Sequence, residues 1–395
     1  MPSGHTSGNA QPKFLLRAKG FSAAALAPAT EEMTFKTYAV EKSFDVHMRV
    51  IDLRSDTVTI PPREMLETIP GAELGDDVYG EDRTVNELQR LAAEKMGKEA
   101  ALLVPSGTMG NTVSLLAQTR RGDEIILESE CHIYHHELGN FASLGGLTPR
   151  LVFSKYGAPD PKDVEALIKP PASLAGGTAL ICLENTHNRH GGTILSPKQM
   201  GAIYQPAKRH GVRVHLDGAR IFNAAIATGL DVKEFTKYTD TMIFCLSKGL
   251  GAPIGSLVLG DEDFIIKARR ARRSLGGGMR KAGVIAAPGI YALEHMVERL
   301  REDHENAHLL AEGIQEIRGI ELDIASVQTN MVAFKAHALG VPHGEFIAKL
   351  SELGVKASEV GPNIRLVTHY GITHEDIESA VNAIHQAVKK LSQSR

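Results

Sequence analysis

Short apolar segments recur along this chain, separated by stretches of helix length, and this alternation limits the possible folds more than any other feature. Runs that are apolar at consecutive positions are typical of parallel strands buried on both faces. The connecting segments must then form helices that cover the two faces of the sheet. The runs are residues 101–104, 124–127, 179–183, 213–216 and 242–246. We therefore predict an α/β protein with a mostly parallel sheet, whose ligands bind beyond the carboxyl ends of the strands.

The pattern changes after a long, charged helical stretch at 282–318. Apolar runs there become fewer and alternate with helical periods, which is typical of an α+β arrangement. We predict a large ligand-binding domain at 48–295, including an N-terminal segment, and a smaller α+β domain at 296–395. The predicted elements of the smaller domain are strands at 330–335 and 364–368 and helices at 344–353 and 374–390.

The first 47 residues lack this regular pattern and are rich in Ser, Ala and Gly. Residues 1–30 contain basic but no acidic side chains, as mitochondrial transit peptides do. Met48 stands directly before the regular pattern, so a natural start there is the alternative that we favour slightly. We expect residues 1–47 to be a disordered or targeting extension, or an addition upstream of that start. The expected compartment is the cytoplasm, with the mitochondrion as the alternative if the extension is a transit peptide.

Charge and apolar content exclude two classes of partner. With 44 basic and 47 acidic residues, the net charge of −3 generates no field that would gather nucleic acid or anionic lipid. The apolar runs are far shorter than the roughly 20 residues of a membrane-spanning helix. The three cysteines are widely spaced and form no CxxC pair, which favours a reducing compartment.

Two charged residues follow neighbouring apolar runs, at the ends of predicted strands. Asp217 alone is better explained as a cap for the next helix. Lys248, in the segment Ser-Lys-Gly-Leu-Gly, adds an amine in a turn where glycines permit close approach of a ligand. A buried carboxylate needs a cation, and a protonated pyridine nitrogen is one that keeps its cofactor an electron sink. Together, Asp217 and Lys248 favour a ligand that both side chains face.

A loop of small residues after the first apolar run suits a phosphate. Ser106, Gly107 and Thr108 join a strand to a helix, where backbone N–H groups and a hydroxyl can bind an anion. Helix capping explains such residues equally well, but a phosphate-bearing cofactor accounts for them together with Lys248. The glycines after Lys248 only superficially resemble a dinucleotide-binding fingerprint. They are misspaced and precede an apolar segment rather than a helix, so we exclude a nicotinamide cofactor.

Histidines provide further candidates for the site. His132 and His136 are four residues apart on a predicted helix, a spacing that suits a metal ion. No Cys or His cluster completes such a site, so we predict no metal. A histidine stacked over a cofactor ring is the better interpretation, and His187 is a second candidate for the chemistry.

From about residue 51 to the C-terminus, the ordered motifs closely resemble those of the low-specificity L-threonine aldolases, which belong to the fold-type I pyridoxal-phosphate enzymes. The motifs are DLRSDTVT at 52–59, GDDVYG at 75–80, SGT at 106–108, LENTHN at 183–188, HLDGAR at 215–220, LSKG at 246–249 and GGGMR at 276–280. The resemblance implies the fold-type I transferase-like fold and pyridoxal 5'-phosphate as cofactor.

The resemblance also implies a role for each matching residue in cofactor binding. Lys248 is expected to carry the cofactor as a Schiff base, with Asp217 paired to the pyridine nitrogen and His132 stacked on the ring. The remaining cofactor contacts are expected from Gly107, Thr108, Ser247, Arg220 and Arg280.

For the substrate, the resemblance implies that Ser55, Arg220 and Arg365 bind the carboxylate of an amino acid. Arg280 is expected to reach the cofactor phosphate of a neighbouring subunit, because family members place their sites at dimer interfaces and are usually homotetramers.

The implied reaction is the cleavage of L-threonine, L-allo-threonine and related β-hydroxy-α-amino acids to glycine and an aldehyde. A base must remove the β-hydroxyl proton, and His132 and His187 are both candidates because imidazole titrates near neutrality. An alanine racemase with the same cofactor is one alternative function. A non-catalytic binding protein that retains the fold is another, which the intact set of Asp217, Arg220 and Lys248 disfavours.

Overall fold

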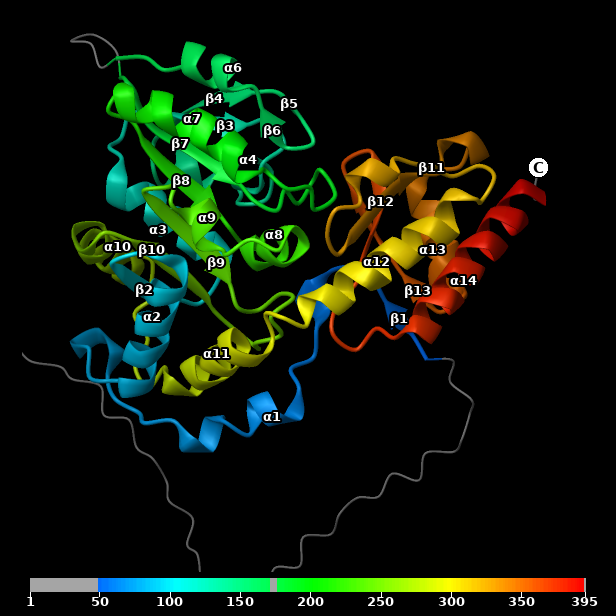
Figure 1. Ribbon diagram of the computed structural model, residues 1–395, viewed down its shortest axis with the longest axis horizontal. Helices are drawn as coiled ribbons and strands as arrows, with labels where there is room; N and C mark the ends of the chain where they lie inside the picture. Colours follow the sequence, from blue (N-terminus) through cyan, green and yellow to red (C-terminus); the bar gives the residue numbers. More distant parts are fainter. Residues whose placement is uncertain (1–48, 171–175, 394–395) are drawn as a thin grey trace, which may run out of the picture. The chain divides into compact units, whose positions relative to one another are not determined.

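A seven-stranded sheet lies at the centre of the larger part of the computed structural model (Figure 1), which describes residues 49–170 and 176–393. The strand order is β2-β10-β9-β8-β7-β3-β4. All five apolar runs form strands, and β10 alone is antiparallel to its two neighbours. The strands are β2 (Ala100–Val104), β3 (Glu124–Glu128), β4 (Thr148–Val152), β7 (Thr178–Glu184), β8 (Arg213–Asp217), β9 (Thr241–Cys245) and β10 (Ser256–Gly260). The predicted mostly parallel sheet is confirmed.

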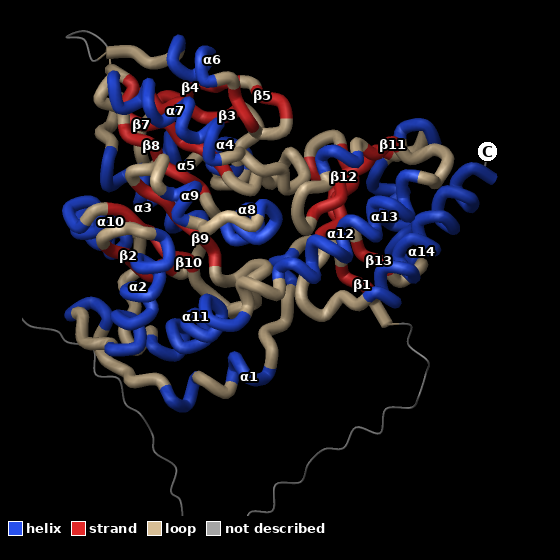
Figure 2. The backbone as a smooth tube through the Cα atoms, in the orientation of Figure 1, coloured by secondary structure: helices blue, strands red, loops and turns tan. Residues whose placement is uncertain are grey.

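Both faces of this sheet are apolar, as buried parallel strands require. On β3, Ile126 packs in one hydrophobic cluster while Ile125 and Leu127 pack in another. Helices therefore cover the strands on both sides (Figure 2). They include α2 (Arg83–Met96), α3 (Gly107–Gln118), α7 (Pro197–Arg209), α8 (Ile221–Thr228), α10 (Glu262–Ser274) and α11 (Gly283–His295).

The register of the strands brings polar side chains to one edge of the sheet. Glu184, at the end of β7, is paired with Asp217, at the end of β8, and Asp217 is paired in turn with Ile243 on β9. Ser247 and Lys248 follow the end of β9 directly. Because these strands are parallel, their carboxyl ends meet at the same edge, where the motif residues then converge.

The C-terminal part contains a second, antiparallel sheet with the order β11-β12-β15-β14. Its core also takes in Leu53, because β1 (Ile51–Asp52) pairs in parallel with β13 (Val355–Lys356). The described residues belong to one compact unit, so the predicted division at 295/296 stays a prediction. The other elements are β11 (Glu321–Leu322), β12 (Met331–Lys335), β14 (Ser358–Val360), β15 (Asn363–Val367), α12 (Leu300–Gln315), α13 (His343–Glu352) and α14 (His374–Gln393).

The helical stretch predicted at 282–318 is two helices, α11 and α12, with a break at 296–299. Met296 at the break is buried and approaches Gly251, which follows the large sheet, whereas α12 packs on α14 and β12. The chain leaves one core for the other at this point, and a single straight helix could not serve both.

The predicted extension at 1–47 lies outside the described residues. Within the described ranges, no helix is both long and apolar enough to cross a bilayer.

Candidate functional site

A cavity of about 190 Å³ opens at the carboxyl ends of β8 and β9 and the start of α3. Six of the predicted site residues line it: Gly107, Thr108, His132, Asp217, Ser247 and Lys248. Asn111, Ala219, Ile243, Cys245 and Ser106 complete the lining. Segments between residues 106 and 248 are thus brought together by the parallel order of the strands.

Asp217 is a buried carboxylate without an ion pair inside the described part of the chain. Its Oδ2 accepts a hydrogen bond from Asn111 Nδ2 at 2.7 Å, and its Oδ1 accepts one from the Ala219 N–H at 3.1 Å. Burial alone would raise the pKa of Asp217, but the charges of His132 and Lys248 and these hydrogen bonds lower it. The side chain is therefore ionised and suited to a protonated ring nitrogen.

Asn111 connects Asp217 to a buried histidine. Its Oδ1 lies 3.1 Å from Nε2 of His215, whose Nδ1 lies 3.0 Å from the Thr241 hydroxyl. Burial lowers the pKa of His215 to about 4, so the ring is neutral near pH 7. Since Asn111 Oδ1 can only accept, His215 Nε2–H donates to it and fixes which end of the amide faces the carboxylates. The functional importance of Asn111 was not predicted.

Glu137 is a second carboxylate that sequence reasoning missed. Its Oε1 lies 3.0 Å from His132 Nδ1 and accepts a hydrogen bond from Asn111 Nδ2 at 2.8 Å. Burial first, and then the nearby charge of Asp217, raise the pKa of Glu137. Partial burial alone would lower the pKa of His132, but the hydrogen bond to Glu137 and the carboxylates around it raise it. An acidic residue five positions after His132, directly after His135 and His136, was the available signal.

The start of α3 forms a cradle for an anion. Ser106 caps this 12-residue helix by accepting a hydrogen bond from the Met109 N–H, while the first N–H groups of a helix have no partner within it. A Cβ on Gly107 would lie 2.8 Å from Cys245 Sγ, so α3 approaches β9 more closely than another residue type would allow. A phosphate fits this end of the cavity and a basic ring nitrogen fits at Asp217, so the residues suit pyridoxal phosphate.

Lys248 lies between two carboxylates. Its charge lowers the pKa of Asp217 and also that of Asp56, which follows β1. Among the described residues, no hydrogen-bond or ion-pair partner of its amine is found, and Gly251, with φ +74°, closes the turn by donating to the Lys248 carbonyl. The amine is thus positioned by charge yet free to react with a carbonyl group.

The predicted carboxylate-binding arginines lie together. Arg220 donates two hydrogen bonds to Asp56, at 2.8 and 2.7 Å, and both residues are buried. Arg220 Nη1 and Arg365 Nη1 then converge on Asn188 Oδ1, at 3.3 and 2.7 Å. Burial, and next the charge of Arg220, lower the pKa of Arg365 to about 10, so it remains charged near pH 7. Two guanidinium groups facing one neutral acceptor form a ready site for a carboxylate.

Ser55 lies beside this pair. Its hydroxyl accepts a hydrogen bond from the Thr57 N–H at 3.2 Å and lies 3.4 Å from Asp56 Oδ1. Neither Asp56 nor Asn188 was predicted as a site residue, although both stand within quoted motifs.

Two further predicted residues belong neither to the cavity lining nor to the arginine pair. His187 is buried, with its Nε2 held 2.9 Å from Glu128. Arg280 is exposed and pairs with Asp76 of the same chain at 2.9 Å. Their predicted roles stay predictions.

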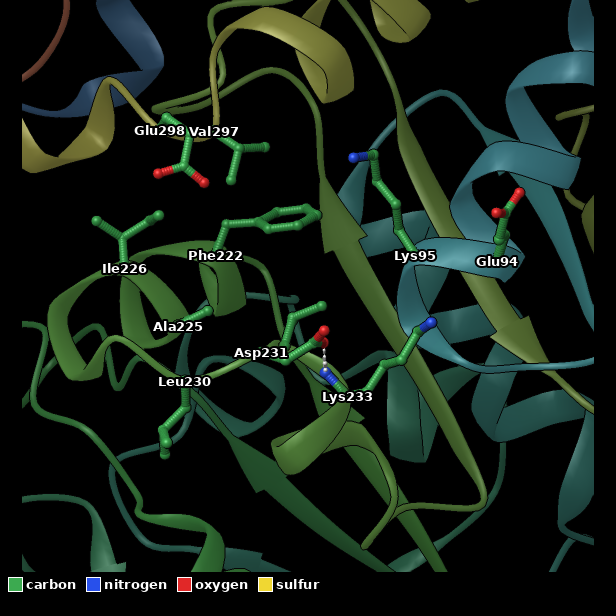
Figure 3. Close-up of a pocket in the computed structure, with 11 residues that line it drawn as sticks. Glu94, Lys95, Phe222, Ala225, Ile226, Leu230, Asp231, Lys233, Val297 and Glu298 are labelled. Atoms are coloured by element: carbon green, nitrogen blue, oxygen red, sulfur yellow. Dashed lines mark hydrogen bonds between the residues drawn. The ribbon is translucent and has the colours of Figure 1, made fainter.

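A larger cavity, of about 320 Å³, lies elsewhere, between α2, α8 and the segment before α12 (Figure 3). Phe222, Ile226 and Leu230 form its apolar part, and Glu94 and Lys95 stand on the opposite side. None of the predicted site residues lines it. The smaller cavity at the strand ends is therefore the candidate active site.

A lysine and an aspartate at the ends of neighbouring strands, facing an anion cradle, define this chain as an α/β enzyme of the fold-type I class. The beta-eliminating lyase family model matches residues 52–337. The chain belongs to this family and, within it, to the low-specificity L-threonine aldolases, which confirms the family predicted from the sequence.

The chain is 43% identical to low-specificity L-threonine aldolase 1 of Arabidopsis thaliana over 86% of its own length and 97% of that protein. It is 33% identical to an alanine racemase of Cochliobolus carbonum, over 86% and 87% of the two chains. The structure of a threonine aldolase from Leishmania major superposes with a TM-score of 0.71 at 20% identity, covering 87% of this chain and 99% of that one. This last likeness supports the fold.

Proposed function

We propose that this protein is a carbon–carbon lyase that cleaves L-threonine, L-allo-threonine and related β-hydroxy-α-amino acids to glycine and an aldehyde, with pyridoxal 5'-phosphate as cofactor. The observation that carries the proposal is that Lys248 and Asp217 line one cavity together with Gly107 and Thr108 at the start of α3. The similarity to threonine aldolases supports the same conclusion.

The cavity residues divide the work of holding the cofactor. Lys248 would bind its carbonyl carbon, Asp217 would pair with its ring nitrogen, and His132 would contact its ring. The start of α3, with the Thr108 and Ser247 hydroxyls, would bind its phosphate. When bound, the cofactor accepts the electron pair that is left on Cα when a bond to that carbon breaks.

The arginine pair orients the substrate. Asp56 holds Arg220 through two hydrogen bonds, so its guanidinium plane is fixed before the substrate arrives. The substrate carboxylate binds Arg220 and Arg365 next to Asn188, with Ser55 alongside. Two contacts on one carboxylate set the rotation about the Cα–N bond, and this rotation selects cleavage of Cα–Cβ rather than Cα–H.

We assign the removal of the β-hydroxyl proton to His132. Its Nδ1 faces Glu137, so Nε2 is the nitrogen available to the cavity. The Glu137 carboxyl stabilises the imidazolium that forms when Nε2 takes the proton. His187 remains the alternative base, acting from outside the cavity lining through water.

The test is steady-state cleavage of the threonine diastereomers, with the absorption spectrum of the purified protein recorded beside it. Lys248→Ala is expected to abolish both the cofactor absorption band and cleavage. Lys267→Ala, at an exposed position on α10, is the matched control and should change neither. Cleavage by the Lys248→Ala protein at the wild-type rate would disprove the proposal.

Racemisation of alanine is a second candidate function, favoured by the similarity to the Cochliobolus carbonum racemase. The same cofactor and lysine serve exchange at Cα–H when that bond is the one aligned with the electron sink. Incubation with L-alanine and chiral detection of D-alanine, in parallel with L-threonine, separates the two. D-alanine formed faster than threonine is cleaved would favour the racemase.

We further propose a cytoplasmic homotetramer with sites at dimer interfaces. Tyr79 and Leu138 are 75% and 96% exposed; Leu138 directly follows Glu137, and Tyr79 lies three positions after Asp76. Exposed large apolar side chains near a site favour contact with another subunit. Sedimentation velocity tests the assembly, and weaker cofactor retention by Arg280→Ala would support the predicted contact with a neighbouring phosphate. Fluorescence imaging of the full chain tests the compartment.

A further inference from the structure

A second group of polar side chains lies outside the cofactor cavity, where β3 ends beside the loop that follows β7. Glu128 ends β3, while His187 and His190 stand in the loop. Nε2 of His187 lies 2.9 Å from Glu128 Oε2, and Nε2 of His190 lies 3.5 Å from Glu128 Oε1. One potential ligand atom from each residue lies within 4.8 Å of the other two. Two imidazoles thus face the two oxygens of one carboxylate.

The loop holds both histidines in place. The backbones of His187 and Thr193 pair, and the Gly192 N–H donates to the His187 carbonyl at 2.8 Å. Gly191 and Gly192 have φ values of +75° and +76°, which other residue types rarely adopt, so the chain reverses sharply here. His187 and His190 are consequently presented on the same side of a tight turn.

Hydrogen bonds also hold the Glu128 carboxylate in place. Glu128 Oε1 accepts hydrogen bonds from the Ser154 hydroxyl at 2.8 Å and the Ser129 hydroxyl at 3.2 Å. Its Oε2 accepts one from the Glu130 N–H at 2.7 Å. Hydrogen bonds of this kind orient metal ligands in proteins and are costly to lose.

The histidines have unused hydrogen-bonding capacity. His187 Nδ1 and His190 Nε2 are buried atoms without a hydrogen-bond partner among the described residues, although the His190 ring keeps 22% of its side-chain surface exposed. Buried polar atoms are rarely left unpaired, so an ion bound to His190 Nε2 would remove the cost at that atom.

We propose that Glu128, His187 and His190 form a binding site for a divalent transition-metal ion of the Zn²⁺ type. Two imidazoles and one carboxylate are a ligand set that Zn²⁺ takes, with water in the fourth position. Zn²⁺ lies about 2.0–2.2 Å from such atoms, so neighbouring ligands are about 3.3 Å apart. The observed separations, 2.9 Å from His187 Nε2 to Oε2 and 3.5 Å from His190 Nε2 to Oε1, lie near this spacing, and the three potential ligand atoms lie within 4.8 Å of one another.

An ion can reach the cluster from the surface. His190 also lines a cavity of about 230 Å³, together with Tyr156, Asp323 and Lys335. The nearby Arg189 is paired with Glu130 at 2.7 Å, which offsets its charge. None of its three ligands lines the cofactor cavity, but His187 is also the alternative base named above, so the variants that test the site are made at His190. The sequence alone predicted no metal, because no Cys or His cluster completes the pair His132 and His136; Glu128 and His187 are 59 positions apart, and no motif joins them.

The experiment titrates Zn²⁺ into the chelator-treated, desalted holoenzyme without a histidine tag, with heat measured by calorimetry. We expect one strong site per chain, and Co²⁺ bound in its place should give the visible absorption of a four-coordinate ion. Loss of an outer-shell contact typically weakens metal binding by about 10- to 100-fold. His190→Gln removes a ligand itself, so it should weaken Zn²⁺ binding by more than that. His210→Gln, at a half-exposed histidine that pairs with Glu165, is the matched control and should bind as the wild type does.

A second variant guards against a merely structural effect. His190→Cys supplies a thiolate, a good Zn²⁺ ligand, so it should retain binding and add thiolate absorption to the Co²⁺ spectrum. Absence of a strong site in the wild type would overturn the proposal. So would equal binding by His190→Gln and His210→Gln, or loss of binding in the folded His190→Cys protein.

Discussion

Replacing Asn111 with alanine should destabilise the protein more than a single lost side chain normally would. Its amide hydrogen-bonds Asp217, Glu137 and His215, all buried. In the Asn111→Ala protein, Glu137 Oε1 still contacts His132, so Glu137 loses the least hydrogen bonding of the three. Asp217 Oδ2 and His215 Nε2 lose their partners in the Asn111→Ala protein. Each buried group left unpaired costs roughly 1–3 kcal/mol, which predicts a total loss of about 2–6 kcal/mol.

Thermal unfolding of the cofactor-free protein measures this loss. At about 2 °C per kcal/mol for a chain of this size, Tm should fall by about 4–12 °C. The cofactor dissociation constant should rise as well, because Asp217 loses the donor that fixes its orientation. Asn86→Ala is the matched control: Asn86 is exposed and donates to the Gly80 carbonyl, so Tm should change little. Equal changes in Tm for the two variants, with unaltered cofactor affinity, would refute the network described for Asn111.

Three further predictions concern the candidate site. Arg365→Lys should raise KM for L-threonine about tenfold or more while cofactor affinity stays constant. The reason is that a hydrogen bond to a charged group contributes roughly 1.5–3 kcal/mol. An unchanged KM would exclude this arginine from substrate binding. Glu137→Gln removes a charge that raises the pKa of His132. Because the base must be neutral to act, the acid limb of the kcat/KM profile should then move to lower pH. An acid limb that stays in place would exclude His132 as the titrating base. Gly107→Ala should weaken cofactor binding, because the added methyl group would contact Cys245 Sγ. Adding Cys245→Ala to the same chain should restore much of the affinity, which cofactor titration measures. If the double variant binds no better than Gly107→Ala alone, the close packing of α3 on β9 is contradicted.

The sequence predicted much of the cofactor cavity because its residues stand at strand ends. Apolar runs locate strands, and in a parallel sheet the carboxyl ends share one edge, so Asp217 and Lys248 could be expected to meet. Asn111 and Glu137 escaped prediction because their importance depends on which buried groups they contact. A polar residue has the same appearance in a sequence whether it faces solvent or another polar group, both inside a helix, as at Asn111, and after one, as at Glu137.

The arginine pair shows a similar division. Arg220 and Arg365 were predicted through the family resemblance, but their partners Asp56 and Asn188 were not. Arg365 lies on β15, within the second sheet, and only the packing of the two sheets places it next to Arg220. Contacts across such a junction have no periodic signal along the chain.

By itself, the sequence determined the α/β class and the family and led to the prediction that Lys248 carries the cofactor, because apolar periodicity and ordered motifs are local properties. Tertiary structure alone decided how the polar groups are paired: His132 with Glu137, Arg220 with Asp56, and His187 with Glu128 outside the cavity. The physical reason is that hydrogen bonds and ion pairs act over a few ångströms in space. Residues separated by 5, 164 and 59 positions come within that range only when the sheets and helices have packed.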